Sequence, residues 1–292
     1  MSLPLHVPVL PAEVIDQLAL GTGQIVVDGT LGGGGHTRLM AEAVGPTGRV
    51  IALDRDPAAV DRAAELLADL PQVTPIHATY ADLPEILHEL GIESVAGILL
   101  DLGLSSDQLA DRERGFSFSS DGPIDLRFDP TRGEPASKLL ARLSAEHLAD
   151  IIYQYGEERF SRRIARRIVE RRKERPIATA TDLAELVRRS VPNARDQKID
   201  AATRTFQALR IAVNAELDAL QSALRRFPSL LAVGGRLAII SFHSLEDRLV
   251  KQAFRESEVL EVITRKPIVA TAGEVAANPR ARSAKLRVAQ RR

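Results

Sequence analysis

The stretch that decides the fold is Ile25-Val26-Val27-Asp28-Gly29-Thr30-Leu31-Gly32-Gly33-Gly34-Gly35-His36. It begins with β-branched apolar residues, passes through an acid and ends in a cluster of glycines, and residues 37–43 continue it with helical periodicity. A strand, a tight glycine turn and a helix in this order are typical of the first βαβ unit of a nucleotide-binding sheet. Glycines allow the backbone to approach a ligand closely because they carry no Cβ.

The spacing of these glycines distinguishes between two kinds of ligand. A dinucleotide fingerprint, G-x-G-x-x-G, read from Gly32 places Thr37 where the third glycine belongs. Read from the acid, Asp28-x-Thr30-x-Gly32-x-Gly34 matches the D-x-G-x-G-x-G type of loop used for S-adenosylmethionine, with Thr30 in the first glycine slot. The spacing therefore favours S-adenosylmethionine, and a plain flexible turn is the alternative that the glycines alone leave open.

Strands alternate with helices along the first hundred residues. The expected strands are 25–27, 49–53, 73–77 and 95–100, and the expected helices between them are 37–43, 58–70 and 82–90. This alternation predicts an α/β fold with a mostly parallel, doubly wound sheet, whose ligands lie outside the carboxyl ends of the strands. We expect Asp28, Asp54, Tyr80 and Asp101 to converge there because each follows a strand. Asp54 lies about 20 residues after the glycines, where an acid accepts ribose hydroxyls.

The alternation breaks between residues 109 and 201. No strand pattern is found there, and the segment predicts an inserted all-helical domain. The pattern resumes with one long helix over 203–226 and a strand over 234–240, and 259–264 with 285–289 are expected to form an antiparallel hairpin. The commonest class of methyltransferase sheet ends in such an antiparallel pair. The expected domains are a methyltransferase domain of residues 1–108 and 202–292 and the insertion of residues 109–201.

The composition excludes several classes of protein. The 292 residues include no cysteine, which rules out disulfides and thiol nucleophiles. The six histidines show no ligand spacing, so no metal site is expected. No apolar run approaches the length of about 18 residues that a membrane span needs, and the N-terminus does not look like a signal peptide. We therefore expect a cytoplasmic protein that makes no membrane contact.

Charge is strongly segregated although the net charge is zero. Residues 159–175 hold nine basic and two acidic residues, and residues 265–292 hold eight basic and one acidic. Two basic clusters on an otherwise acidic chain favour a polyanionic partner such as nucleic acid. A solvated helix face and a loose tail are the alternatives. Phe116 and Phe118 are candidates either for stacking on a base or for packing the insertion.

Two loops carry candidate catalytic residues. Asp101 begins the first, at the place where amino-methyltransferases hold the target amine with an acid-Pro-Pro-aromatic motif, although the Pro-Pro-aromatic part is absent here. Asp101 is either an orienter of that amine or a cofactor-loop or capping acid. The second loop contains Ser241 and His243, and His243 is a candidate general base or substrate partner. Alternatively, Ser244 caps the next helix, with Asp247 completing a capping box.

The chain resembles the MraW family of 16S ribosomal RNA cytosine-N4 methyltransferases. The blocks that carry the resemblance are His6–Leu10, Asp28–Arg38, Asp101–Ser106, Arg114–Asp129, Tyr155–Arg172, Thr205–Leu217, Ser241–Lys251 and Asn278–Arg287. The resemblance implies a Rossmann-like class I methyltransferase fold with S-adenosylmethionine as cofactor. It also implies methyl transfer to the exocyclic N4 of a cytidine in the decoding region of bacterial 16S rRNA, within the small ribosomal subunit.

The resemblance further implies which residues form the site. Cofactor contacts carry over to Gly34, Gly35, His36, Asp54, Tyr80, Asp101 and Gln108. The catalytic candidates remain Asp101, Ser241 and His243, and the insertion is expected to recognise RNA. The oligomeric state stays open between a monomer and a homodimer. Two alternative functions are a non-catalytic RNA-binding protein that keeps this fold and a DNA amino-methyltransferase, which would need a target-recognition domain that is missing here.

Overall fold

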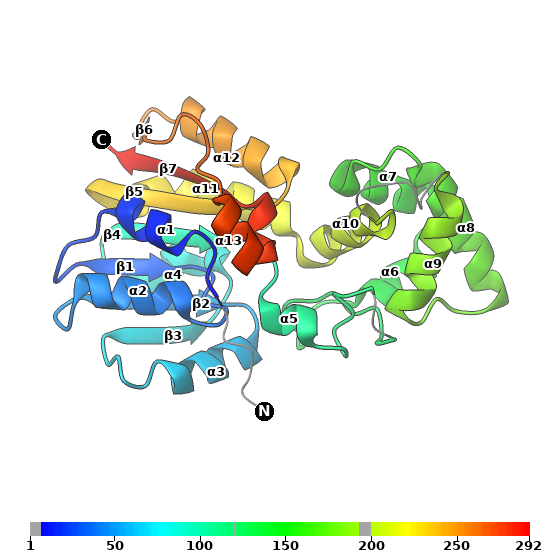
Figure 1. Ribbon diagram of the computed structural model, residues 1–292, viewed down its shortest axis with the longest axis horizontal. Helices are drawn as coiled ribbons and strands as arrows, with labels where there is room; N and C mark the ends of the chain where they lie inside the picture. The colour runs from blue at the N-terminus through cyan, green and yellow to red at the C-terminus, as the bar shows by residue number, and fades with distance from the viewer. Residues whose placement is uncertain (1–6, 119–120, 193–199) are drawn as a thin grey trace. The chain divides into compact units, whose positions relative to one another are not determined.

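The computed structural model describes residues 7–118, 121–192 and 200–292, and the chain divides into two compact units (Figure 1). The first unit comprises Met1–Ser105 and Leu217–Arg292, and the second comprises Ser106–Glu216. The second unit therefore extends further along the chain than the expected insertion of residues 109–201. Among the helices of the described ranges, none has the length and apolar character required to cross a membrane.

The first unit contains a seven-stranded sheet of order β3-β2-β1-β4-β5-β7-β6. Strands β1 to β5 are parallel, and β7 runs antiparallel to both β5 and β6. The expected doubly wound sheet and its antiparallel closing hairpin are thus confirmed. The strands are β1 Ile25–Asp28, β2 Arg49–Asp54, β3 Val73–His77, β4 Val95–Asp101, β5 Leu231–Ser241, β6 Leu260–Val262 and β7 Lys285–Arg291.

Helices cover both faces of this sheet. They are α1 Pro11–Leu18, α2 Gly35–Val44, α3 Pro57–Leu66, α4 Leu83–Glu89, α11 Glu216–Leu230, α12 Ser244–Glu256 and α13 Ala272–Ala277, with short 3-10 helices η1 Tyr80–Asp82 and η3 Pro279–Ser283. Successive strand residues point to opposite faces. Ile98 and Leu100 accordingly join the core that contains α4, α11 and α12, whereas Leu99 joins the core beneath α1 and α2. The strands are apolar throughout because both faces are buried.

The expected long helix over residues 203–226 is wrong in one respect. The structure has two helices, α10 Ala202–Asn214 and α11 Glu216–Leu230, and they are separated at Ala215. Ala215 has φ of 49°, a left-handed conformation that ends a helix. A left-handed alanine gives no sequence signal of the kind that glycine provides, so the continuous helical periodicity concealed the break. As a result, α10 belongs to the second unit and α11 to the first.

The second unit is built mainly of helices. They are α5 Ser106–Ala110, α6 Ala136–Arg142, α7 Ala145–Gly156, α8 Ser161–Glu174, α9 Ala180–Ser190 and α10. Helix α7 packs against both α8 and α10. A Cβ at Gly156 would lie 2.5 Å from the carbonyl oxygen of Arg204, so the small residue permits the close approach of α7 to α10. A single antiparallel bridge, between Pro123 and Thr179, is the exception to the helical content in the part of this unit that the structure describes.

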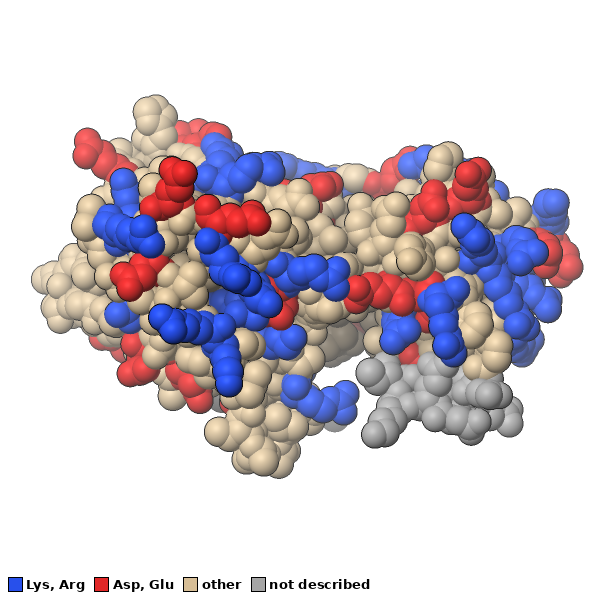
Figure 2. Space-filling model, turned by 90° about the horizontal axis from the view of Figure 1, so that it is seen from above, with Lys and Arg blue, Asp and Glu red and all other residues tan. Residues whose placement is uncertain are grey.

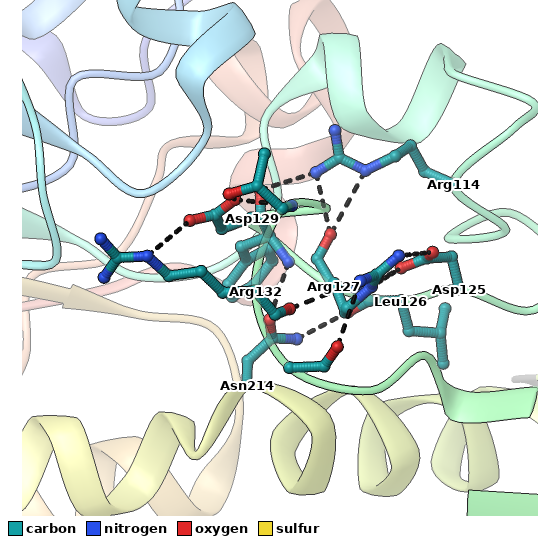
Figure 3. A network of polar contacts seen from close by, with 10 residues as sticks. Arg114, Asp125, Leu126, Arg127, Asp129, Arg132 and Asn214 are labelled. Atoms are coloured by element: carbon teal, nitrogen blue, oxygen red, sulfur yellow. Dashed lines mark hydrogen bonds and ion pairs between the residues drawn. The ribbon is translucent and has the colours of Figure 1, made fainter. Parts of the chain in front are cut away.

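The loop that precedes α6 is held by side chains that satisfy its backbone (Figure 3). The buried guanidinium of Arg114 donates to the carbonyl oxygens of Arg127 (2.8 Å) and Phe128 (2.7 Å). The amide of Asn214 donates to the carbonyl of Leu126 (2.6 Å) and accepts from the N–H of Phe128 (2.7 Å). Buried carbonyl and N–H groups are costly without partners. These two side chains therefore fix the loop in one conformation.

The two aromatic candidates of this loop are engaged in packing. Phe116 is buried and stacks on Phe128 with ring centroids 5.8 Å apart. Phe118 meets Phe206 of α10 edge-on at 5.5 Å. Of the two roles that the sequence left open, the structure places these rings in the packing of the second unit.

Two glycines of the second unit provide a matched test of this packing. Gly115 and Gly133 have nearly equal positive φ angles, 67° and 69°. A Cβ at Gly115 would lie 2.1 Å from the carbonyl oxygen of Pro123, whereas a Cβ at Gly133 would meet nothing within 4 Å. We expect Gly133→Ala to cost only the backbone strain, about 1 kcal/mol of unfolding free energy. Gly115→Ala should cost several times more because backbone must move. Urea unfolding of both variants measures the difference, and equal losses would contradict the expectation.

Candidate functional site

The carboxyl ends of four parallel strands carry the polar residues singled out in the sequence. Asp28 ends β1, Asp54 ends β2, Asp101 ends β4 and Ser241 ends β5. The strand order reverses between β1 and β4, and in such sheets ligands bind at this switch point. Tyr80 opens η1 after β3, and its Cβ lies 3.1 Å from where a Cβ of Gly29 would stand. The expected convergence of these residues at one edge of the sheet is found.

Asp28 organises the turn that follows β1. Its carboxylate is fully buried and accepts the Thr30 N–H (3.0 Å) and the Thr37 hydroxyl (2.7 Å). The Thr30 hydroxyl lies 3.5 Å from Asp28 Oδ1 and accepts the backbone N–H of Asp101 (2.6 Å). Burial raises the pKa of Asp28, and the hydrogen bonds from Thr37 and Thr30 partly offset that rise. Thr37, which stands in place of the third glycine of a dinucleotide fingerprint, and Thr30, which fills the first glycine slot of the S-adenosylmethionine type of loop, are therefore the partners of this acid.

The local backbone and its neighbours favour glycine at three positions of the cluster. Gly32 and Gly34 have φ of 50° and 76°, which favour glycine. A Cβ at Gly35 would lie 3.0 Å from Pro8, and α2 begins at this residue. The positive φ angles and the closeness of Pro8 explain why glycine occupies positions 32, 34 and 35. Their contact with a cofactor stays a prediction, which the close approach of bare backbone to the strand ends supports.

Asp54 fastens the glycine turn to β2. One of its carboxylate oxygens accepts the N–H of Gly32 (2.7 Å), and the other accepts the N–H of Asp56 (2.9 Å). Burial raises the pKa of Asp54 to about 6 even though these two hydrogen bonds oppose the rise. Each carboxylate oxygen has a second lone pair, so both can accept a further hydrogen bond from a ligand hydroxyl. The spare lone pairs support the role of a ribose-binding acid, and the contact of Asp54 with a ribose stays a prediction.

Asp101 and His36 lie side by side at the end of β4. The Nδ1 atom of His36 is 3.6 Å from Asp101 Oδ2, and His36 Nε2 is 2.9 Å from the carbonyl oxygen of Val9. Since a carbonyl only accepts, Nε2 carries a hydrogen, and Nδ1 faces the carboxyl group. The other oxygen of Asp101, Oδ1, is buried and has no hydrogen-bond partner among the described residues. A buried oxygen of this kind is available to a donor on a ligand.

The protonation of Asp101 depends on opposing neighbours. Burial raises the pKa of its carboxyl group to about 6. The nearby His36 and Arg280 lower this pKa, and Asp28 and Glu246 raise it. A group poised in this range changes charge on small changes of its surroundings, which is typical of functional carboxyl groups.

The loop that follows β5 caps the next helix, α12, in a different way from the one expected. The N-cap of α12 is His243 and not Ser244, and the box is closed by Glu246 and not Asp247. His243 Nδ1 accepts the Glu246 N–H at 3.4 Å, and Glu246 Oε2 accepts the N–H groups of Phe242 and His243. His243 Nε2 lies 3.1 Å from Glu246 Oε1 without a geometry that makes a hydrogen bond. Histidine is an uncommon cap, so the spacing of Ser244 and Asp247 was misleading.

Ser241 and Gln108 complete the predicted set. Ser241 is buried, and its hydroxyl points to the carbonyl oxygen of Lys285 at 3.4 Å, so the group is directed toward β7. Gln108 is buried in α5, which belongs to the second unit. Its expected cofactor contact stays a prediction.

The C-terminal basic cluster is largely structural rather than a loose tail. Residues 285–291 form β7 inside the sheet. Asp247 of α12 accepts from Arg287 (2.7 Å) and Lys285 (3.2 Å), and these two cations lower its pKa against the effect of burial. Asp247 thus joins α12 to β7. The charge count of the sequence did not reveal this role because the acid lies 38 and 40 residues before its partners.

Comparison with known proteins agrees with the resemblance found in the sequence. A model of the MraW methylase family matches residues 4–292. A protein of Rhodopirellula baltica named ribosomal RNA small subunit methyltransferase H is 51% identical over 98% of this chain and 91% of its own length. Proteins of the same name from Syntrophotalea carbinolica and Deinococcus deserti are each 50% identical over 98% of this chain. The alignments cover 98% and 93% of those two proteins.

The raised pKa of Asp54 predicts that the free energy of unfolding falls as pH rises. Since the folded protein holds this proton more tightly than the unfolded chain, the stabilisation is full below the ordinary pKa of 3.8 and is lost as pH rises through about 6. Asp54→Asn cannot titrate. Between about pH 4 and 6 it should therefore lose roughly 1–2 kcal/mol less stability than the unsubstituted protein.

Urea unfolding midpoints at several pH values measure this difference. Asp69→Asn is the matched control because Asp69 is exposed and Arg38 lowers its pKa, which keeps it ionised over the same range. Stability curves of the Asp54→Asn variant and the unsubstituted protein that run parallel would contradict the prediction.

Proposed function

The chain belongs to the MraW methylase family, and from this premise we propose that it transfers a methyl group from S-adenosylmethionine to N4 of a cytidine in the decoding region of 16S rRNA. The name that its relatives share supports RNA of the small ribosomal subunit as the methyl acceptor. The observation that carries the proposal for an amine acceptor is the buried Asp101 Oδ1, which lacks a partner among the described residues at the end of β4.

The first unit supplies residues that fit the cofactor. The two oxygens of Asp54 would accept the ribose hydroxyls, and the backbone of Gly32 to Gly35 offers a surface without Cβ atoms at the same strand end. His36 and Tyr80 are buried beside the glycine turn and would complete the walls. When bound, S-adenosylmethionine supplies a methyl group on a positively charged sulfur. The ionised forms of Asp54 and Asp101 would therefore favour its binding.

The residues of the site act on the amine mainly by positioning. An exocyclic amine is a weak nucleophile because its lone pair is delocalised into the ring. Asp101 Oδ1 accepts one N–H of that amine, which orients the lone pair and stabilises the positive charge that develops on nitrogen. His36, whose Nε2 donates to the Val9 carbonyl, lies beside the other carboxylate oxygen of Asp101. Prior removal of a proton is unnecessary, since the methylated amine is acidic and releases it readily.

We favour Asp101 over Ser241 and His243 as the acceptor of the amine N–H because the other two side chains already make contacts within the protein. The Ser241 hydroxyl is directed to a carbonyl of β7, and the His243 ring serves as a helix cap through Nδ1. Both roles are structural. In the described part of the first unit, the buried side-chain atoms without a hydrogen-bond partner are Asp101 Oδ1 and His243 Nε2. Asp101 Oδ1 is the acceptor of the two, because His243 Nε2 carries the hydrogen when Nδ1 accepts the Glu246 N–H.

The second unit carries a surface that fits an RNA backbone. Helix α8 exposes Arg162, Arg163, Arg166 and Arg167, and the described residues include no acidic partner for any of them. Arginines four residues apart on one helix repel one another, so the helix retains them at a cost to its own stability. Phosphates would relieve this repulsion and make binding dependent on salt. The target cytidine would have to be unpaired to present N4.

A methyl-transfer assay tests the proposal. The full chain is incubated with S-adenosylmethionine carrying a labelled methyl group and with small ribosomal subunits from cells that lack the corresponding activity. The labelled nucleoside is then identified by mass spectrometry. We expect N4-methylated cytidine from the decoding region. Absence of transfer together with absence of cofactor binding in calorimetry would overturn the proposal, and binding to subunits without any methyl transfer would favour the non-catalytic alternative.

Asp101→Ala separates the proposed role of this residue from simple cofactor binding. Removal of the acceptor oxygen should lower kcat at least as much as it lowers cofactor affinity, by roughly a hundredfold or more. Single-turnover kinetics and calorimetry measure the two quantities. Asp61→Ala, which changes an exposed acid on α3, is the matched control and should behave like the unsubstituted protein. A loss confined to cofactor affinity would reduce Asp101 to a cofactor contact.

A further inference from the structure

Helix α12 of the first unit presents cations on its outer face. Val250 and Phe254 are buried in the core, whereas Arg248, Lys251 and Arg255 are exposed at spacings of three and four residues. Residues at this spacing share one side of a helix. Figure 2, seen from above, shows basic side chains on the first unit with acidic side chains among them. Helix α12 is therefore amphipathic, and a strip of positive charge lies on its side away from the core.

Two hollows follow this strip. One has a volume of about 340 Å³ and is bounded by α12, by β7 and by residues of the β6 region, including Val262, Thr264 and Arg265. The other has a volume of about 440 Å³ and lies along α12 from Arg248 to Glu256. Both are lined by Lys251 and Arg255, and we refer to the two hollows together as the α12 groove.

The α12 groove has an excess of positive charge. Five of its lining residues are basic (Arg248, Lys251, Arg255, Arg265 and Arg287), and one, Glu256, is acidic. Arg287 is neutralised by Asp247. Glu256 accepts from the amide of Gln252 (3.0 Å).

Three of these cations have no internal role. Among the described residues, Lys251, Arg255 and Arg265 have no hydrogen-bond or ion-pair partner, and all three are exposed. No contact within the described residues accounts for their charges. Their arrangement is therefore best explained by an external anion with charges repeated along a line.

We propose that the α12 groove binds the phosphate backbone of small-subunit ribosomal RNA through Lys251, Arg255 and Arg265. This inference rests on the proposed function for the identity of the RNA. Cations spaced along a groove match a linear polyanion better than a single small anion, because each side chain can neutralise a different phosphate. Contacts to phosphate carry no sequence information, so the groove would add affinity and orientation rather than choice of base.

The salt dependence of binding tests the proposal. Filter binding of the full chain to purified small ribosomal subunits, without cofactor, is measured over a series of salt concentrations. For the variant Lys251→Gln/Arg255→Gln/Arg265→Gln, we expect affinity to fall at least about tenfold at low salt and the slope of log affinity against log salt to decrease by about 2. Each single substitution should lower the slope by about 0.7–0.9.

Arg225→Gln is the matched control for each single substitution. Arg225 is exposed on α11 of the same unit, has no partner among the described residues and lies outside the groove. It should leave the slope unchanged, and thermal unfolding should show that every variant is folded. An unchanged slope in the triple variant would overturn the proposal. The proposal would also be overturned if the triple variant lost binding to phosphatidylglycerol vesicles but bound subunits as tightly as the unsubstituted protein.

Methyl transfer separates this proposal from the proposed function. Under saturating subunits, the triple variant should keep its kcat and its cofactor affinity while KM for subunits rises about tenfold or more. If the unsubstituted protein transfers no methyl group, the proposed function fails whatever the groove does. If transfer is normal but the triple variant binds subunits as tightly as the unsubstituted protein, the groove proposal alone fails.

Discussion

The buried carboxylate of Asp28 is the constraint on which the site depends. It lies at the end of β1 with no solvent exposure, so its oxygens need partners inside the protein. Thr30 and Thr37 supply them, and Thr30 also receives the N–H of Asp101 from β4. A single acid therefore sets the course of the glycine turn, the start of α2 and the junction of two strands. The cost of burying it is evident in its raised pKa.

The other carboxyl groups of the site depend on this turn. Gly32 reaches Asp54 only because the turn bends back over β2, and His36 faces Asp101 because α2 begins immediately after the glycines. Burial raises the pKa of Asp54 and of Asp101 to about 6, so both groups are sensitive to a ligand that brings hydroxyl or cationic groups. The backbone thus holds two carboxyl groups whose pKa values lie near 6. This combination suits a site that must position an amine and a charged cofactor together.

Much of the first unit could be predicted from the sequence, and the exceptions have physical causes. The parallel strands and the closing hairpin were correct because apolar runs bounded by turns are local signals. The break at Ala215 was missed because a left-handed alanine looks like any helix former. The cap at His243 was missed because serine is the commoner cap. The last part of the basic C-terminal cluster proved to be strand β7, since only the folded sheet brings Asp247 to Lys285 and Arg287.

The sequence by itself determined the sheet, the glycine turn and the acids at the strand ends, because each is encoded by residues close together in the chain. It also determined the family. The tertiary structure decided which of those side chains keep a hydrogen-bonding atom without a partner. It places the Ser241 hydroxyl against β7 and His243 Nδ1 at the start of α12, and it leaves Asp101 Oδ1 and His243 Nε2 without hydrogen-bond partners in the described residues. It also places Lys251, Arg255 and Arg265 around one hollow. Such facts depend on distances between residues that are remote in sequence, and only folding establishes those distances.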